Sequence, residues 1–306
     1  MSTDPENPLG IKPSTFKLID EALLIQEEDA QAAGTLGFMA RAMVMATLPH
    51  KNPKTNRFTR KNGNYTLSIS APFENVGLPY GTYPRLLLAW ISTEAVKTKK
   101  QELVLGKSLS GFMSSLGLIP TGGRWGTISR LKDQMDRLLS ANFACRYDGV
   151  IANRAGVQTL KLDVAKSFEF WWEPKNPNQG SLWDSTLTLS TSFYDEVISN
   201  PIPVDLRALK ALKGSAMALD IYTWATWRVF TARGKKVRIP WPLLQAQFGS
   251  AYADTRSGQQ AFRRNFMKQL MRVKTVYPDL NIDKFEHGIL LLPSRPHIKQ
   301  VQPVDK

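Results

Sequence analysis

Positively charged side chains and amides gather on one side of a helix that the sequence predicts over residues 257–277. On a helical wheel of about 100° per residue, Phe262, Phe266, Leu270 and Val273 share one face, which must pack on a domain core. The opposite face and its flanks carry the candidate contact residues: Arg256, Ser257, Gln260, Arg263, Arg264, Lys268, Arg272 and Thr275.

These residue types suit a nucleic-acid duplex. From Arg256 to Lys274 the sequence contains six Lys or Arg and no Asp or Glu. Cations neutralise phosphates, whereas Gln260 and Arg264 can form bidentate bonds to adenine or guanine edges in the major groove. A solvated helix normally mixes charge signs, so we predict that this helix reads DNA; a basic surface without a ligand is the alternative.

A second basic group precedes the helix. Lys235, Lys236 and Arg238 lie just before a predicted helix-turn-helix, where they can contact backbone phosphates. An ordinary basic surface turn would have the same composition, and this alternative stays open.

An earlier helix, predicted over residues 125–140, has a weaker basic character. Three arginines lie on or beside it: Arg124, Arg130 and Arg137. Its outer face also carries Asp133 and Asp136, which oppose phosphate binding. We expect this helix to add phosphate contacts, a second groove contact or a protein interface.

The elements that position these residues occur twice. Residues 66–70 and 186–190 are alternating strand-like segments, each with a Phe three residues later. An apolar helix follows each strand, at residues 83–96 and 208–231. Each copy continues with a short strand, a short helix that ends in Gly, a turn and a long amphipathic helix, which is the order of a helix-turn-helix.

Smaller features complete the two copies. The short strands are predicted at residues 102–105 and 236–239, and the short helices at 108–116 and 242–248. Gly117 and Gly249 fit the left-handed position that ends a helix. The strand-like pairs 143–147 with 159–170 and 280–285 with 288–292 then predict a β-hairpin, or wing, in each copy.

We therefore predict an α+β fold made of two tandem winged-helix domains with an N-terminal arm. Residues 1–60 form the arm, partly flexible, with a basic loop around Lys51, Lys54, Arg57, Arg60 and Lys61. The Pro- and Asn-rich stretch 173–180 marks the domain boundary. Residues 61–175 form the first domain, for dimerisation or auxiliary DNA contact, and residues 176–306 the second, for the main DNA recognition.

Composition agrees with a DNA-binding protein. The chain of 306 residues has 40 Lys+Arg against 26 Asp+Glu, a net charge of +14, which favours a polyanionic partner. The single cysteine, Cys145, is expected to be a buried free thiol in a reducing compartment. The acidic N-terminus is unlike a signal peptide and no apolar run is long enough to span a bilayer, so we expect a cytoplasmic protein without membrane contact.

Catalytic chemistry is not predicted. Gly106-Lys107-Ser108 resembles the end of a phosphate-binding loop, but the required first Gly is Gln101, so capping of a helix by Ser108 explains it better. His50, His287 and His297 are isolated from one another; His287 fits the tip of the second wing. We expect no catalytic residue, metal or cofactor, whereas a primase or nicking relaxase would need clustered acids or histidines.

Several segments resemble the plasmid-encoded replication initiators of the RepA type, over roughly residues 66–298. They are Tyr83-Pro84-Arg85-Leu86-Leu87-Leu88-Ala89-Trp90, Gly122-Gly123-Arg124-Trp125-Gly126, Ala218-Leu219-Asp220-Ile221-Tyr222-Thr223-Trp224, Phe262-Arg263-Arg264-Asn265-Phe266 and Leu291-Leu292-Pro293-Ser294-Arg295-Pro296-His297.

The resemblance implies a protein that binds direct repeats in double-stranded DNA at a plasmid origin. It also implies melting of nearby A·T-rich DNA and recruitment of the host replication initiator and helicase-loading machinery. Related initiators bind repeats as monomers, while homodimers through the first domain repress their own gene and limit copy number. A winged-helix transcriptional repressor that binds an operator is the alternative.

Overall fold

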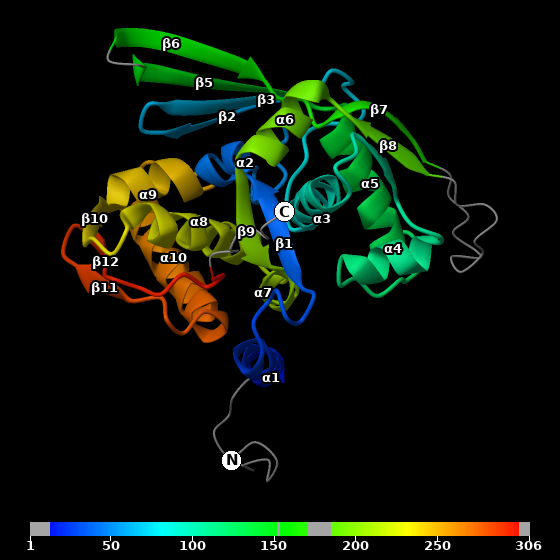
Figure 1. Cartoon of the computed structure of the whole chain (residues 1–306). Helices are drawn as coiled ribbons and strands as arrows, with labels where there is room; N and C mark the ends of the chain where they lie inside the picture. Colours follow the sequence, from blue (N-terminus) through cyan, green and yellow to red (C-terminus); the bar gives the residue numbers. More distant parts are fainter. Residues whose placement is uncertain (1–12, 152–153, 171–184, 300–306) are drawn as a thin grey trace, which may run out of the picture.

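The structure is a computed structural model that describes residues 13–151, 154–170 and 185–299 (Figure 1). The described residues combine helices with sheets whose strand pairs are all antiparallel, so the fold is α+β, as predicted. Residues 13–60 contain α1 (Pro13–Glu27), β1 (Leu36–Ala40), α2 (Arg41–Met45) and most of β2 (Arg57–Asn62).

The first half of the chain follows the predicted order closely. Its helices are α3 (Tyr83–Thr98), α4 (Leu109–Ser115) and α5 (Thr127–Ser140). Its strands are β3 (Tyr65–Ser70), β4 (Glu102–Val104), β5 (Asn142–Ile151), β6 (Arg154–Lys161), β7 (Ala165–Glu169) and β8 (Thr186–Leu189). The Ser108 hydroxyl accepts a hydrogen bond from the Gly111 amide, which confirms that Ser108 caps α4.

The second half repeats part of this order, namely a long helix, a strand, two helices and a hairpin, after two additional helices and a strand. Its helices are α6 (Thr191–Ser199), α7 (Leu206–Leu212), α8 (Ala216–Ala232), α9 (Trp241–Phe248) and α10 (Arg256–Val276). Its strands are β9 (Pro201–Asp205), β10 (Val237–Pro240), β11 (Ile282–Phe285) and β12 (Gly288–Leu291). The prediction of a single helix over residues 208–231 is wrong, because the structure has two helices there, α7 and α8. Gly214 lies between them, and the Ser215 side chain caps the start of α8.

Two three-stranded sheets have the same strand pattern. In β10-β12-β11 the last strand is central, and in β4-β8-β7 the last strand is again central. In the sheet β10-β12-β11, Ile239 pairs with Ile289, and in the sheet β4-β8-β7, Leu103 pairs with Leu187, so each sheet buries an apolar pair. Strand pairing therefore repeats for these two sheets, but the predicted equivalence of residues 66–70 and 186–190 is wrong: β3 pairs with β2 and β5 in another sheet, whereas β8 takes the place that β12 has in the second copy.

The hairpin predicted as the first wing is placed differently. The predicted pairing forms in part, because Cys145 lies opposite Leu160 and Arg146 opposite Thr159, but β5 also pairs with β3, so this hairpin belongs to a separate four-stranded sheet, β2-β3-β5-β6. The reason is apolar matching: Phe143 lies opposite Ile69 and Cys145 opposite Leu67, and all four are buried. Cys145 is a buried free thiol, as predicted.

The stretch 173–180, which carries the predicted domain boundary, lies outside the described residues. The strands on either side of it, β7 and β8, pair with each other in one sheet. Strand β8 also pairs with β4, so residues 186–189 contact the first copy through backbone hydrogen bonds. The division at residue 175/176 thus separates two paired strands.

The two predicted left-handed glycines behave differently. Gly117 has a φ of +71°, as predicted, whereas Gly249 has a φ of −105° and is not left-handed. Gly249 has a different requirement, because a Cβ there would lie 2.7 Å from the Gln245 carbonyl oxygen. Close approach of the backbone, and not its handedness, accounts for this glycine.

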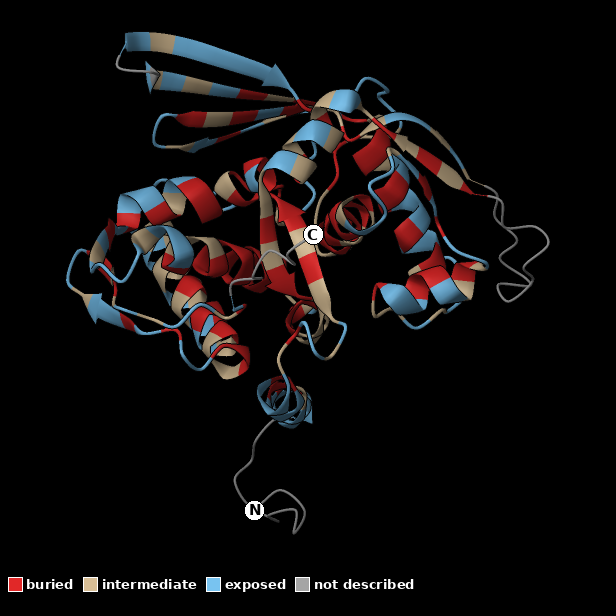
Figure 2. Cartoon of the chain, viewed as in Figure 1, coloured by how far each residue is buried: buried red, intermediate tan, exposed pale blue. Residues whose placement is uncertain are grey.

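The N-terminal region is attached to both halves. Strand β1 pairs with β9, β2 pairs with β3, and α1 packs against α7 and α10. Arg60, predicted in an exposed basic loop, lies in β2 and is buried, which lowers its pKa to about 10. Figure 2 shows that the buried residues form a continuous interior across the two halves.

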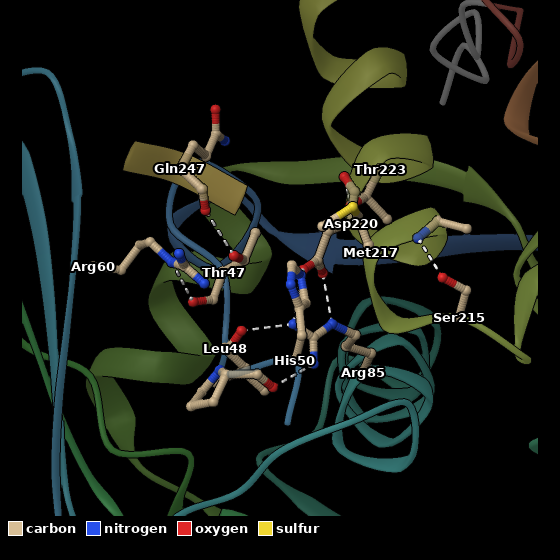
Figure 3. Close-up of polar contacts among 12 residues, drawn as sticks. Thr47, Leu48, His50, Arg60, Arg85, Ser215, Met217, Asp220, Thr223 and Gln247 are labelled. Carbon is tan, nitrogen blue, oxygen red and sulfur yellow. Dashed lines mark hydrogen bonds and ion pairs between the residues drawn. The ribbon is translucent and has the colours of Figure 1, made fainter. Parts of the chain in front are cut away.

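A buried polar cluster fixes α3 against α8 (Figure 3). Arg85 Nε and Nη2 donate to Asp220 Oδ1 and Oδ2, each at 2.7 Å, and His50 Nε2 lies 2.7 Å from Asp220 Oδ2. Arg85 Nη2 also donates to the Leu48 carbonyl oxygen at 2.7 Å. One carboxylate therefore joins the first copy, the second copy and the segment before β2.

The protonation states of this cluster follow from burial and charge. Burial would raise the pKa of Asp220, but the Arg85 charge and the hydrogen bonds from His50 and Arg85 lower it below its ordinary value. Burial lowers the pKa of His50 and outweighs the opposing effect of its bond to Asp220. The cluster is thus an ion pair between Arg85 and Asp220 with a neutral imidazole beside it.

Among the described residues, no helix combines the length and apolar character required to cross a membrane.

Candidate nucleic-acid interface

Helix α10 is held by a capped start and an aromatic core. The Thr255 hydroxyl accepts a hydrogen bond from the Gly258 amide at 3.1 Å, which caps the helix. Phe262 and Phe266 are fully buried, and the ring centroid of Phe266 lies 5.6 Å from Phe248 and 6.1 Å from Trp241. These contacts fix the rotation of α10 and therefore its outer face.

That outer face presents the predicted polar residues to solvent. The following side chains are exposed: Arg256, Ser257, Gln260, Arg264 and Lys268. Within the described part of the chain, no carboxylate lies within ion-pair distance of Arg256, Arg264 or Lys268. The three cations are thus available to an external anion.

Arg263 and Arg272 occupy a different environment. Both are half-buried, and the Arg263 guanidinium lies 5.7 Å from the centroid of the Trp241 ring. Its buried Nε has no hydrogen-bond partner among the described residues. Arg272 Nη1 donates to Gln269 Oε1 at 3.2 Å, and burial lowers the pKa of Arg272. Arg263 thus supports the edge of the outer face, whereas Arg272 packs along the helix.

A hollow of about 540 Å³ separates α10 from the hairpin β11–β12. Arg263, Arg264 and Met267 line it from α10, and Lys284 and Glu286 line it from the hairpin. His287 lies at the exposed tip of this hairpin, as predicted. Lys284 was not predicted as a contact residue, although its place on the second strand-like pair was visible in the sequence.

The basic group before α9 is exposed as well. Lys235 and Lys236 lie in the turn after α8, and Arg238 lies in β10, opposite Leu290 of β12. None of these three side chains has an ion-pair partner in the described residues. Arg238 thus lies in the same three-stranded sheet as the β11–β12 hairpin, and Lys235 and Lys236 lie in the turn that leads into this sheet.

The structure separates the three arginines of the first copy. Arg137 is half-buried, and its Nε lies 2.9 Å from both carboxylate oxygens of Asp133, so a protein charge already neutralises it. Arg124 and Arg130 are exposed and free of such a pair within the described residues. The basic part of this helix is therefore its N-terminal end.

The basic character of the N-terminal end of α5 is visible in the sequence, although it was not predicted. Residues 103–132 contain Lys107, Arg124, Arg130 and Lys132 but no Asp or Glu. The side chain of Trp125, in the turn before α5, is 75% exposed. The internal repeat did not mark this residue as a contact residue. Apolar spacing predicts where helices lie, but it does not predict whether an aromatic side chain in a turn is exposed.

The elements described so far define an α+β protein in which one long helix presents an acid-free basic face beside a β-hairpin. The family described as Plasmid encoded RepA protein matches residues 78–241, more than half of the chain, and the chain belongs to this family. This confirms the resemblance seen in the sequence. The match ends at Trp241, before α10 begins.

Solved structures resemble the chain at low sequence identity. The crystal structure of SeMet derivatives of domain 2 and domain 3 of RctB is 11% identical, covers 81% of this chain and 95% of that chain, and has a TM-score of 0.49. The crystal structure of the RctB domains 2-3 is 12% identical, covers 81% and 94% of the two chains, and has a TM-score of 0.46. No curated protein sequence matches the chain.

Proposed function

We propose that this chain initiates replication of its plasmid by binding direct repeats of double-stranded origin DNA through α10. The observation that carries the proposal is the outer face of α10, which exposes Arg256, Arg264 and Lys268, none of them in an ion pair with a carboxylate of the described residues. Membership of the plasmid-encoded RepA family supports a role at a plasmid origin.

The proposal treats each copy as a winged helix. In the second copy, α9 and α10 form the helix-turn-helix and β11–β12 the wing, because the order α8-β10-α9-α10-β11-β12 is that of this motif. In the first copy, α4 and α5 take these places, and β7–β8 takes the place of the wing. The β5–β6 hairpin is then an insertion.

On this view α10 lies in the major groove. Gln260 and Arg264 reach base edges from its N-terminal half, while Arg256 and Lys268 contact the flanking phosphates. Lys284 of the hairpin, together with Lys235, Lys236 and Arg238, extends the contact along the backbone. Arg124 and Arg130 supply a weaker contact from the first copy.

The chain acts in this proposal by binding and not by catalysis. Once bound to the repeats, it recruits the host initiator and the helicase-loading machinery to the origin. As a homodimer it represses its own gene, which limits copy number. Incubation of the pure protein with primer-template or supercoiled plasmid DNA and divalent metal should yield neither primer synthesis nor nicking; either product would contradict this part of the proposal.

The test is an anisotropy titration against duplexes tiled across the plasmid origin, with scrambled controls at roughly 50 and 200 mM salt. Binding confined to a repeated element is expected, and with six to eight phosphates neutralised it should weaken about a thousandfold or more over this range. A single bound site near the promoter would identify an operator-binding repressor instead. Uniformly weak binding to every duplex would contradict both functions.

A further inference from the structure

The turn that precedes α5 exposes a tryptophan from a rigid backbone. Trp125 is 75% exposed, and Ile119 earlier in the same segment is also 75% exposed. A large aromatic side chain left in water loses the burial energy that folding normally gains from it. Its exposure needs an explanation that packing within the described residues does not supply.

The turn itself is held by a network of hydrogen bonds. The amides of Thr121 and Thr127 each donate to the other's hydroxyl at 2.9 Å, and the Thr127 hydroxyl donates to the Ile119 carbonyl oxygen at 2.6 Å. Ser129 Oγ donates to the Gly123 carbonyl oxygen at 2.9 Å. The ring of Trp125 is therefore presented by an ordered turn and not by a frayed end.

The surroundings of the ring suit a planar, negatively charged ligand. The guanidinium of Arg124 lies 5.2 Å from the centroid of the Trp125 ring, and Arg130 is exposed one turn into α5. A Cβ placed on Gly122 or Gly123 would meet no atom within 4 Å, so the backbone of the turn just before Trp125 is uncovered. No acid occurs in the sequence from residue 103 to residue 132.

We propose that Trp125 is a stacking site for an unpaired base of single-stranded DNA, with Arg124 and Arg130 on the adjacent phosphates. Every nucleobase has an apolar face that stacks on an aromatic ring, and cations beside the ring neutralise the backbone. A paired base has both faces covered by its neighbours, so the ring selects a strand that is already open. This inference rests on the proposed function at the origin and adds a site for open DNA that is distinct from α10, although Arg124 and Arg130 also supply the weaker duplex contact proposed above.

The test compares Trp125→Ala and Trp125→Phe in titrations with an oligo(dT) of about 15 nucleotides, near the upper site size of one single-strand binding module. Trp125→Ala should weaken binding at least fivefold, roughly the smallest effect expected for one stacked base, and Trp125→Phe should retain most of the affinity. Oligo(dT) should also quench a part of the tryptophan fluorescence that is missing in Trp125→Phe.

Two controls separate this site from others. Phe73→Ala removes another exposed aromatic side chain, 56% exposed, from a different loop, and should leave oligo(dT) binding unchanged. Arg264→Ala should reduce binding of the repeat duplex but not of oligo(dT), because α10 is a different site. Circular dichroism of each variant checks that the chain still folds.

The outcomes are distinct. If Trp125→Ala binds oligo(dT) as wild type does, or if it weakens duplex and single strand equally, the stacking site is disproved. If no repeat is recognised yet Trp125→Ala still loses affinity for oligo(dT), the role at the origin fails and the stacking site stands. A loss of affinity for oligo(dT) with Ile119→Ala that Trp125→Ala does not show would place the strand on Ile119 and not on the Trp125 ring, and would overturn the proposal.

Discussion

Helices α5 and α10 hold the same place in the two copies, but their outer faces differ in charge. Arg264 and Lys268 lie on a helix without acids and form no ion pair within the described residues, whereas Asp133 of α5 neutralises Arg137 and Asp136 lies exposed nearby. The two helices bury apolar faces of the same kind, so packing does not explain the contrast. A repeated scaffold can thus keep its core while its copies differ in outer charge, and this difference is the basis of the proposed division of DNA contacts between them.

The strongest test of the comparison uncouples the two copies. Asp220→Asn should destabilise the chain by about 3–5 kcal/mol, the usual effect of removing one partner of a buried ion pair, because Arg85 would keep an uncompensated charge. Chemical denaturation measures the loss. Asp148→Asn, which breaks the exposed pair with Arg146, is the matched control and should leave the denaturation midpoint nearly unchanged.

The next largest effect concerns base reading. Arg264→Ala should weaken binding of the repeat by about 1–3 kcal/mol and reduce discrimination against scrambled DNA. Arg130→Ala, an equally exposed arginine of α5, should weaken both duplexes alike. If the two variants lower the specificity ratio to the same extent, the division between α10 and α5 is wrong.

Acidification should act on the cluster that joins the copies. Because burial lowers the pKa of His50, the unfolded chain takes up a proton below pH of about 6.5 while the folded chain does not. Stability from this histidine is complete above that pH and falls below it, by at most about 1.4 kcal/mol per pH unit. The low pKa of Asp220 acts in the same direction at still lower pH.

Denaturation of wild type and His50→Gln at about pH 7.5 and 5.5 measures this dependence. Wild type should lose more stability than the variant over that interval. Equal losses would show that His50 is not the group responsible, and His297, whose pKa burial also lowers, would then be examined in the same way.

The long helices α3, α5 and α10 and the Ser108 cap of α4 followed from the sequence because they depend on local spacing, whereas α6 and the break between α7 and α8 did not. Residues 257–277 were predicted for α10, and the helix spans Arg256–Val276. The partner of β5 was not predictable in this way, since Ile69 and Phe143 meet across a long stretch of chain. The pair Arg85 and Asp220, 135 residues apart, was missed for the same reason.

The candidate site was predicted in part. Apolar spacing fixed the outer face of α10, and Arg264 and Lys268 are exposed there. Spacing could not tell that Arg137 already has a carboxylate partner or that Arg272 is half-buried, because both depend on side-chain packing.

A smaller effect should distinguish phosphate contacts from base contacts. Lys236→Ala should weaken binding to all sequences alike and reduce the slope of log K against log salt by about one. Affinity for repeat and scrambled duplexes, measured over a salt series, gives both numbers. A loss confined to the repeat would mean that Lys236 takes part in base recognition.

The smallest predicted change runs in the opposite direction. Asp136→Asn removes an exposed acid from α5 and should raise affinity for any duplex by at most about threefold, because one repulsive charge near the phosphates is lost. Thr275→Asp, which adds an acid to the half-exposed flank of α10, should lower it. No change in either variant would place both positions away from the DNA.

The most direct test of base reading by α10 is protection of guanine N7 from dimethyl sulfate, because this atom lies in the major groove. Wild type should protect one or more guanines at the same position of every repeat. Arg264→Ala should lose protection there, while Arg130→Ala should keep it. Unchanged protection with Arg264→Ala, or its loss with Arg130→Ala, would contradict the assignment of sequence reading to α10.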